Sequence, residues 1–222
     1  RTGVPGALEI GAVVVDLTTE VAAQLAFAAL ALAVLLSRGA GPGTTVPIIV
    51  ALGVLALLVY GFYLAQRHGA LARSARHLER IAGIGVPATS EFARTLDCAM
   101  RCIYRRRRRV RLSAELHLLA WLAGVFQVYV AAAFLGNAID WLDALILEGL
   151  VTAARAAAFM IPGGLGVQEG AFILLGGLVG LPSEIALALS LVRRVRDLLF
   201  GAPGSLVWHA GVRRWASVPS VR

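Results

Sequence analysis

Four apolar stretches of about 20 residues or more constrain this chain more than any other feature. They run from about Ala7 to Leu36, Val46 to Ala65, Leu112 to Leu135 and Trp141 to Ile161. A helix of about 20 apolar residues crosses the roughly 30 Å hydrocarbon core of a bilayer. Only 15% of the 222 residues are charged, against about 25% in a soluble domain. We therefore expect an all-α, polytopic transmembrane bundle that forms one membrane domain over residues 1–222.

A shorter apolar segment near the C-terminus has a different character. Pro162 and a glycine-rich stretch precede it, and it runs for about 11 residues from Ala171 to Leu181. This length is too short for a regular crossing, so we expect a broken or re-entrant helix. Ser183 and Glu184 then begin a last long helix, predicted from about Ile185 to His209.

The longest polar stretch lies in the middle of the chain. Residues 67–111 contain twelve arginines and three acidic residues. Apolar positions recur at helical spacing around 71–82 and 92–103, with Ser90 as a cap for the second segment, which predicts two amphipathic helices on the membrane surface. Because basic loops stay on the cytoplasmic side, we expect the loop at 66–111 and the C-terminus to be cytoplasmic. The arginines can serve as this topology signal alone or also bind anionic lipid headgroups.

Several ionisable residues interrupt the apolar sequence. Such a residue costs at least about 2.5–3.5 kcal/mol at membrane depth, so it usually faces a cavity or a partner. Two functions are open: a polar cavity that receives a headgroup or ion, or salt bridges that orient the helices. Arg193 and Asp197 have the spacing for a direct pair. The candidate binding residues are Asp16, Glu20, Glu148, Arg155, Glu169, Arg193, Arg194 and Asp197.

The glycines after Pro162 form a second candidate binding site. Gly163, Gly164, Gly166 and Gly170 leave backbone amides accessible. A helix that begins in this stretch would direct the positive end of its dipole at an anion such as a lipid phosphate. Packing of small residues between helices is the alternative explanation of the same glycines.

Other chemistries find little support in the sequence. The chain has no lysine, which excludes a Walker-type phosphate loop and a Schiff-base lysine. We find no catalytic constellation and no metal-ligand motif, and therefore expect no enzyme activity, no metal and no cofactor. Cys98 and Cys102 are expected to be reduced thiols. Nucleic-acid binding is not expected, because the arginines are tethered between membrane spans.

The glycine-rich stretch carries a family resemblance. Ile161 to Ala171, with the sequence IPGGLGVQEGA, and the later segment from Ala186 to Arg194 resemble the flippase-like membrane domain of lysylphosphatidylglycerol synthases. Segments 174–177 and 190–194 are most similar to a stand-alone branch associated with hopanoid biosynthesis. The segment from Asp16 to Glu20 lies where the family carries a charged motif. Family members also have further helices upstream, so we expect that an N-terminal part of the natural protein precedes Arg1.

This resemblance implies translocation or handling of lipids in a bacterial inner membrane, linked to hopanoid or charged-phospholipid metabolism. Membrane lipids, with an anionic headgroup or a hopanoid body, and lipid-biosynthesis enzymes are the implied partners. Aminoacylation is not implied, because the soluble transferase domain of the synthases is not in this chain. The alternatives are a non-transporting scaffold for lipid-modifying enzymes and an intramembrane enzyme.

Overall fold

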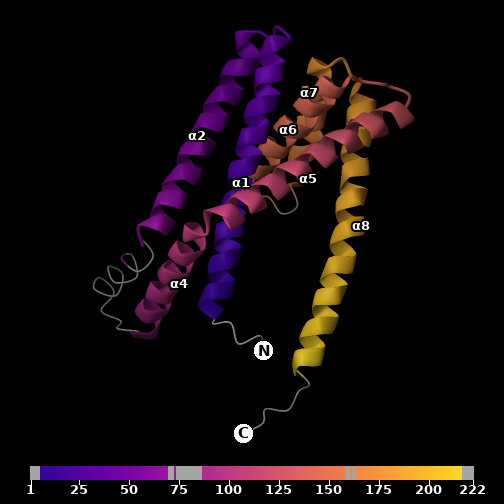
Figure 1. Cartoon of the computed structure of the whole chain (residues 1–222). Coiled ribbons are helices and arrows are strands. Elements are labelled where there is room, and N and C mark those ends of the chain that lie inside the picture. The colour runs from indigo at the N-terminus through magenta and orange to yellow at the C-terminus, as the bar shows by residue number, and fades with distance from the viewer. Residues whose placement is uncertain (1–5, 70–72, 74–86, 159–160, 162–163, 217–222) are drawn as a thin grey trace.

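The regular secondary structure of the described residues is entirely helical. The computed structural model describes residues 6–69, 73, 87–158, 161 and 164–216, and Figure 1 shows the arrangement of their helices. This confirms the expected all-α fold. The seven helices in the described ranges are α1 (Gly6–Ser37), α2 (Pro42–Arg67), α4 (Pro87–Arg105), α5 (Arg107–Phe134), α6 (Trp141–Ala157), α7 (Val167–Leu178) and α8 (Ser183–Ala216).

Three of the described helices, α1, α2 and α5, are long and apolar enough to span a membrane. The expected fourth span was too long at its C-terminal end: α6 has 17 residues and ends at Ala157. The backbone N–H of Ala158 still bonds to the carbonyl of Ala154, and the chain then leaves the helix. The third span was predicted too short, because the arginine run itself continues into α5 from Arg107.

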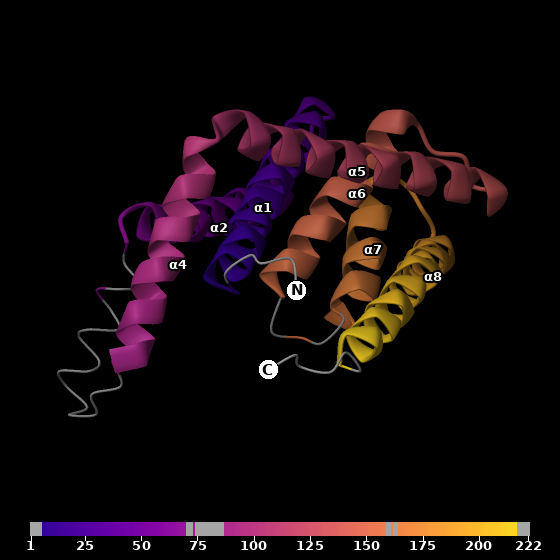
Figure 2. The same cartoon turned by 60° about the horizontal axis from the view of Figure 1, so that its bottom comes forward.

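α1 is the element around which the others assemble. It packs against α2, α4, α5 and α6, and Figure 2 shows α5 running across the bundle over α1 and α6. The main core lies where these helices meet and includes the fully buried side chains of Phe27, Val125, Leu147 and Phe172. Since these residues come from α1, α5, α6 and α7, one apolar cluster joins both halves of the chain.

A glycine sets the contact between α1 and α6. A Cβ atom added at Gly149 would lie 2.5 Å from the Cβ of Ala31 and 3.5 Å from the ring of Phe27. No side chain fits that space without moving a helix. The small pair therefore lets the two backbones approach closely, as small residues do between membrane helices.

α2 presents its apolar surface outward. None of the residues in the apolar 18-residue stretch of this helix is buried in the structure, and Val50, Leu57 and Leu58 are more than half exposed. Exposed apolar surface of this extent would be costly in water, so it identifies the side that faces lipid.

The basic segment between α2 and α5 folds in part onto α1. α4 begins at Pro87, so Ser90 lies inside the helix and is not the cap that we expected. Leu96 and Met100 are buried against Val15 of α1, whereas Phe92 stays exposed. We expected the apolar face of this helix to lie on the membrane surface, but α1 covers much of that face. The amphipathic helix predicted around 71–82 lies outside the described residues, apart from Arg73.

The C-terminal third contains the short helix that the sequence predicted. α7 has 12 residues and ends in a turn at Gly180, whose φ of 76° favours glycine. α8 begins at Ser183, so the two residues expected as its cap lie inside the helix, and it is longer than predicted. It continues through Pro203 to Ala216, a length of 34 residues.

An ion pair joins two loops at one end of the bundle. Arg38, after α1, pairs with Asp140, the residue before α6. Asp140 also accepts a hydrogen bond from the backbone N–H of Asp143 at 2.7 Å and so caps α6. The hydrogen bond from Arg38 and the capping N–H lower the pKa of the Asp140 carboxyl below its usual value.

The contact at Gly149 can be tested by substitution. We expect Gly149→Leu to destabilise the protein by about 1–3 kcal/mol, because overpacking forces α1 and α6 apart. Gly53→Leu on α2 is the matched control, since no atom lies within 4 Å of a Cβ at that position. Thermal midpoints in detergent measure both variants. Equal midpoints for the two variants would contradict the close approach of α1 and α6.

The loop ion pair predicts a pH dependence. Asp140→Asn keeps a capping side chain but removes the charge. Because the folded pKa of Asp140 is lowered, its charge stabilises the fold above the unfolded pKa, about 3.9, and that stabilisation disappears as the pH falls through the folded pKa. We expect the variant to have a lower thermal midpoint than the wild type at pH 7. The two midpoints should converge as the pH falls below about 4. A constant difference at all pH values would contradict this role.

Candidate functional site

A buried ion pair lies at the centre of the C-terminal third. Nη1 of Arg193, on α8, lies 2.7 Å from Oε2 of Glu148, on α6, and the two side chains are 3% and 1% exposed. Nη2 of Arg193 donates to the hydroxyl of Thr152 at 2.9 Å. Glu148 and Thr152 are four residues apart and therefore share one face of α6. Arg193 thus contacts both polar side chains of that face.

The surrounding helices leave space for the Glu148 carboxylate. A Cβ atom at Gly124 of α5 would lie 2.5 Å from Oε1 of Glu148. Among the atoms that the structure describes, Oε1 of Glu148 and Nε of Arg193 have no hydrogen-bond partner. Breaking a buried pair of this kind by removing one partner typically costs about 3–5 kcal/mol.

A second, more exposed pair adjoins the first. Nη1 of Arg155, near the end of α6, lies 3.2 Å from Oδ2 of Asp197, and these side chains are 30% and 38% exposed. Arg196 contacts the other oxygen of Asp197 at 2.8 Å and donates to the side chain of Gln127 on α5. Asp197 therefore lies between two guanidinium groups.

A third pair holds the start of α7. Arg194 pairs with Glu169, and the other oxygen of that carboxylate accepts a hydrogen bond from the backbone N–H of Gly166 at 2.8 Å. Gly166 precedes α7 with a φ of 80°, a conformation that favours glycine. One residue before Glu169, the buried Gln168 donates to the carbonyl of Ser190 at 2.8 Å. The beginning of α7 is thus tied to α8 by two side chains.

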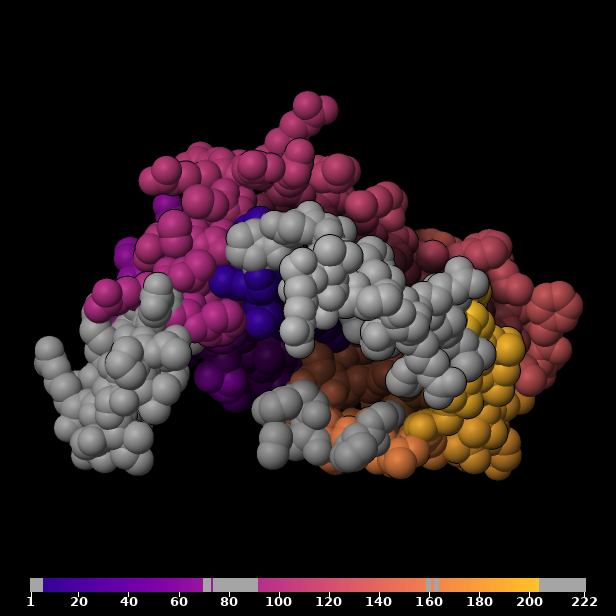
Figure 3. Space-filling view, turned by 90° about the horizontal axis from the view of Figure 1, so that it is seen from below, coloured from indigo at the N-terminus to yellow at the C-terminus, as the bar shows by residue number. Residues whose placement is uncertain are grey.

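A small cavity lies beside the buried pair. Its volume is about 310 Å³, and its polar lining residues are Gln24, Trp121, Thr152, Arg155 and Arg193. Nε1 of Trp121 is buried and has no hydrogen-bond partner within the described residues. Gln24 donates to the carbonyl of Thr152 at 2.7 Å. In Figure 3, α6 (brown) lies farther from the viewer than α7 (orange) and α8 (yellow). The lining offers mainly hydrogen-bond donors and therefore suits an acceptor such as a phosphate or a hydroxyl.

The structure brings together most of the predicted site residues. Arg155, Gly164 and Arg193 line the cavity, and Gly170 lies in the first turn of α7. Gly163 lies outside the described residues. The predicted pairing of Arg193 with Asp197 is wrong: Arg193 pairs with Glu148, and Asp197 pairs with Arg155 and Arg196.

Asp16 and Glu20 lie apart from this cluster. Asp16 is exposed on α1 and accepts a hydrogen bond from the hydroxyl of Ser113 at 2.7 Å. Nε2 of His117 lies 3.4 Å from the same oxygen. Because Ser113 donates to the carboxylate and not to His117, this group lacks the base-to-nucleophile contact of a hydrolase. Glu20 is half-buried one turn further along α1.

Sequence reasoning missed the neutral polar residues of the site. Gln24, Trp121, Gln127 and Thr152 all contact the charged residues or line the cavity. Each of them is a polar or amphipathic side chain inside an apolar stretch, and this pattern could have indicated them. An uncharged group costs less to bury than a charged one, so it is a weaker indicator of a site. No group of three or more His, Cys, Asp or Glu residues in the described part of the chain could hold a metal ion.

The buried pair predicts a double-mutant result. We expect Arg193→Met to destabilise the protein by about 3–5 kcal/mol, because it leaves Glu148 buried without its partner. The double variant Glu148→Leu/Arg193→Met should recover most of this loss. Arg111→Met is the control, since Arg111 and Glu115 form an exposed pair worth at most about 1 kcal/mol. Thermal midpoints in detergent give the comparison, and a double variant less stable than Arg193→Met would refute the pairing.

Comparison with known proteins identifies the family but no near relative. No curated protein and no solved structure matches the chain significantly. The family model described as the lysylphosphatidylglycerol synthase TM region matches residues 1–204. This match covers the three apolar spans and the whole charged cluster of α6, α7 and the first part of α8. The chain therefore belongs to the family of lysylphosphatidylglycerol synthase transmembrane regions.

Proposed function

We propose that this chain handles membrane lipids as a flippase-like domain and that the cavity beside the Glu148–Arg193 pair receives a polar lipid headgroup. The observation that carries this proposal is a cavity lined by two arginines within apolar helices. Ionisable residues are costly at membrane depth and usually mark a pathway or a binding site. The unpartnered N–H groups of Trp121 and Arg193 supply donors for a ligand.

The two ion pairs at the cavity have different roles in this proposal. The pair of Glu148 and Arg193 is almost fully buried, so it holds α6 and α8 together. The pair of Arg155 and Asp197 is about one-third exposed, and Asp197 keeps a second partner in Arg196. Arg155 can therefore exchange the Asp197 carboxylate for a lipid phosphate at low cost.

The substrate class follows from the same donors. Guanidinium groups bind phosphate oxygens well, which favours a charged phospholipid, whereas the hydroxyl groups of a hopanoid would use the neutral donors. The chain itself carries out no bond-making step in this proposal. Its partners are lipids and the enzymes that make them.

The orientation that we propose follows the arginine distribution. Residues 66–111 and the C-terminus face the cytoplasm of a bacterial cell, and the loops at 38–45 and 136–143 face outward. The positive-inside rule supports this assignment, because the first of these stretches contains twelve arginines.

A vesicle assay tests the transport proposal. The full-length protein is reconstituted with a fluorescent phospholipid, and translocation is measured by dithionite quenching. We expect Arg155→Gln to lower the translocation rate at least about tenfold, the effect of losing one charge-assisted hydrogen bond of about 1.5 kcal/mol or more. Arg108→Gln, an arginine outside the cavity, should leave the rate unchanged.

The outcome also separates transport from the scaffold alternative. Wild-type protein that moves no lipid, but retains lipid-biosynthesis enzymes in a pull-down through the segment 105–109, would replace transport with scaffolding. Transport that survives Arg155→Gln would leave the family function intact and refute the assignment of the cavity.

A further inference from the structure

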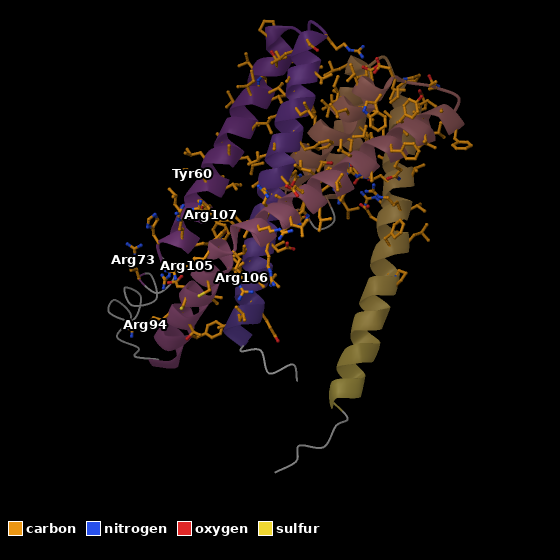
Figure 4. The ribbon with its side chains drawn as sticks, in the orientation of Figure 1. Tyr60, Arg73, Arg94, Arg105, Arg106 and Arg107 are labelled. Atoms are coloured by element: carbon orange, nitrogen blue, oxygen red, sulfur yellow. The ribbon has the colours of Figure 1, made fainter. Side chains whose placement is uncertain are left out.

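A larger cavity lies away from the charged cluster. It is a groove of about 960 Å³ between α1, α2, α4 and α5. This volume is at the upper end of ordinary ligand sites. The groove is large enough for a lipid headgroup together with the upper part of its acyl chains, and Figure 4 shows its position at the junction of α4 and α5, beside Tyr60 of α2.

The lining of this groove has a charged part and an apolar part, as a phospholipid does. The basic side chains of Arg67, Arg101, Arg105, Arg107 and Arg111 provide the polar part. The apolar part comes mainly from the spanning helices, with Leu25 of α1 and Ala56 and Val59 of α2. A ligand that fills the groove must therefore combine negative charge with hydrocarbon.

The groove carries more positive charge than its own acids neutralise. No acidic side chain among the described residues lines it. Within the described residues, Arg105 and Arg107 form no ion pair, and Arg67 donates to the hydroxyl of Tyr63 at 3.1 Å. Arg111 has only the exposed partner Glu115 at 3.5 Å. Arg101 lies beside Asp97, near Gly69, so within the described residues the charge without a carboxylate partner rests on Arg67, Arg105 and Arg107.

A hydrogen-bonded network fixes one wall of the groove. The hydroxyl of Tyr104 donates to the side-chain oxygen of Gln66 at 2.9 Å, and the buried Gln66 donates to the hydroxyl of Thr18 at 2.7 Å. The rings of Tyr63 and Tyr104 meet edge to face, with centroids 5.2 Å apart. Three helices are thus joined behind the arginines, so the groove is preformed and does not need a ligand to assemble its polar wall.

The aromatic residues indicate the depth of the groove in the membrane. Tyr60 and Tyr63 lie near the end of a span whose apolar residues are exposed to lipid, and tyrosine is enriched at the level of the headgroups. These rings line the same groove as Arg67, Arg105 and Arg107. A phospholipid whose chains lie along α2 would place its phosphate beside them.

We propose that this groove is a binding site for one anionic phospholipid, which joins the α1–α2 hairpin to the α4–α5 junction. The guanidinium groups of Arg105 and Arg107 bind the phosphate, and the acyl chains cover Leu25, Ala56 and Val59. This site is separate from the cavity beside Glu148 and holds a resident lipid and not the transported one. It therefore does not depend on the proposed transport function.

The test compares lipid binding by purified full-length protein in detergent. Native mass spectrometry counts bound lipids, and the thermal midpoint reports their effect on stability. Phosphatidylglycerol and phosphatidic acid serve as anionic probes, phosphatidylcholine as the zwitterionic probe, and inorganic phosphate as the free anion. We expect one tightly bound anionic lipid, a higher thermal midpoint with that lipid, and little effect of phosphatidylcholine or phosphate.

A matched pair of variants locates the site. Arg105→Gln/Arg107→Gln removes two charges from the groove and should weaken anionic-lipid binding by about thirtyfold, given about 1 kcal/mol per arginine. Arg106→Gln/Arg108→Gln removes the same charge from the same segment, but these two arginines do not line the groove. This control should bind as the wild type does.

A third variant keeps every charge in place. Ala56→Trp fills the apolar part of the groove from an exposed position on α2, and it should also lose the bound lipid. Equal losses in the groove and control arginine pairs would overturn the proposal in favour of unspecific attraction to the basic segment. Tight binding of inorganic phosphate that displaces the lipid would overturn it in favour of a soluble anion. Undiminished binding by Ala56→Trp would show that no acyl chain occupies the groove.

Discussion

The ion pair of Glu148 and Arg193 is the interaction on which the C-terminal half depends. Moving either charge alone into an apolar interior costs several kcal/mol, and attraction in that interior offsets the cost only when geometry and hydrogen bonding are good. Here Thr152 adds a second hydrogen bond, and Gly124 leaves space for the carboxylate. The position of α8 relative to α6 is therefore set by charge as well as by apolar packing.

α8 extends this arrangement to the neighbouring helices. Within five residues it carries three arginines and one aspartate, whose partners lie on α5, α6 and α7. The apolar side chains of the same helix, such as Leu198, Leu199 and Phe200, are largely exposed. In a membrane those residues contact lipid and contribute little to helix association. The polar contacts therefore determine how α8 packs, which explains why charged residues are concentrated in this part of the helix.

Much of the architecture could be predicted from the sequence, because the hydrocarbon thickness fixes the length of an apolar helix. The ranges of α1 and α2, the short α7 and the start of α8 follow from apolar runs and from Gly and Pro. The pairing of the charges could not be predicted in this way. Spacing suggested Arg193 with Asp197, whereas Arg193 reaches Glu148, 45 residues away. Such partners depend on which helix faces meet, and local periodicity does not determine this.

The two polar regions of the molecule differ in how their charges are compensated. This difference is the basis for the two different roles that we propose for them. In the cluster around α8, four arginines face three carboxylates, and each carboxylate has an arginine partner. In the transport that we propose, a headgroup entering there must compete with an existing ion pair, so we expect its binding to be weak and reversible. In the groove beside Tyr63, none of the carboxylates that the structure describes competes for Arg105 or Arg107. In the lipid binding that we propose for this groove, an anionic lipid would gain the full attraction of these groups and would remain bound.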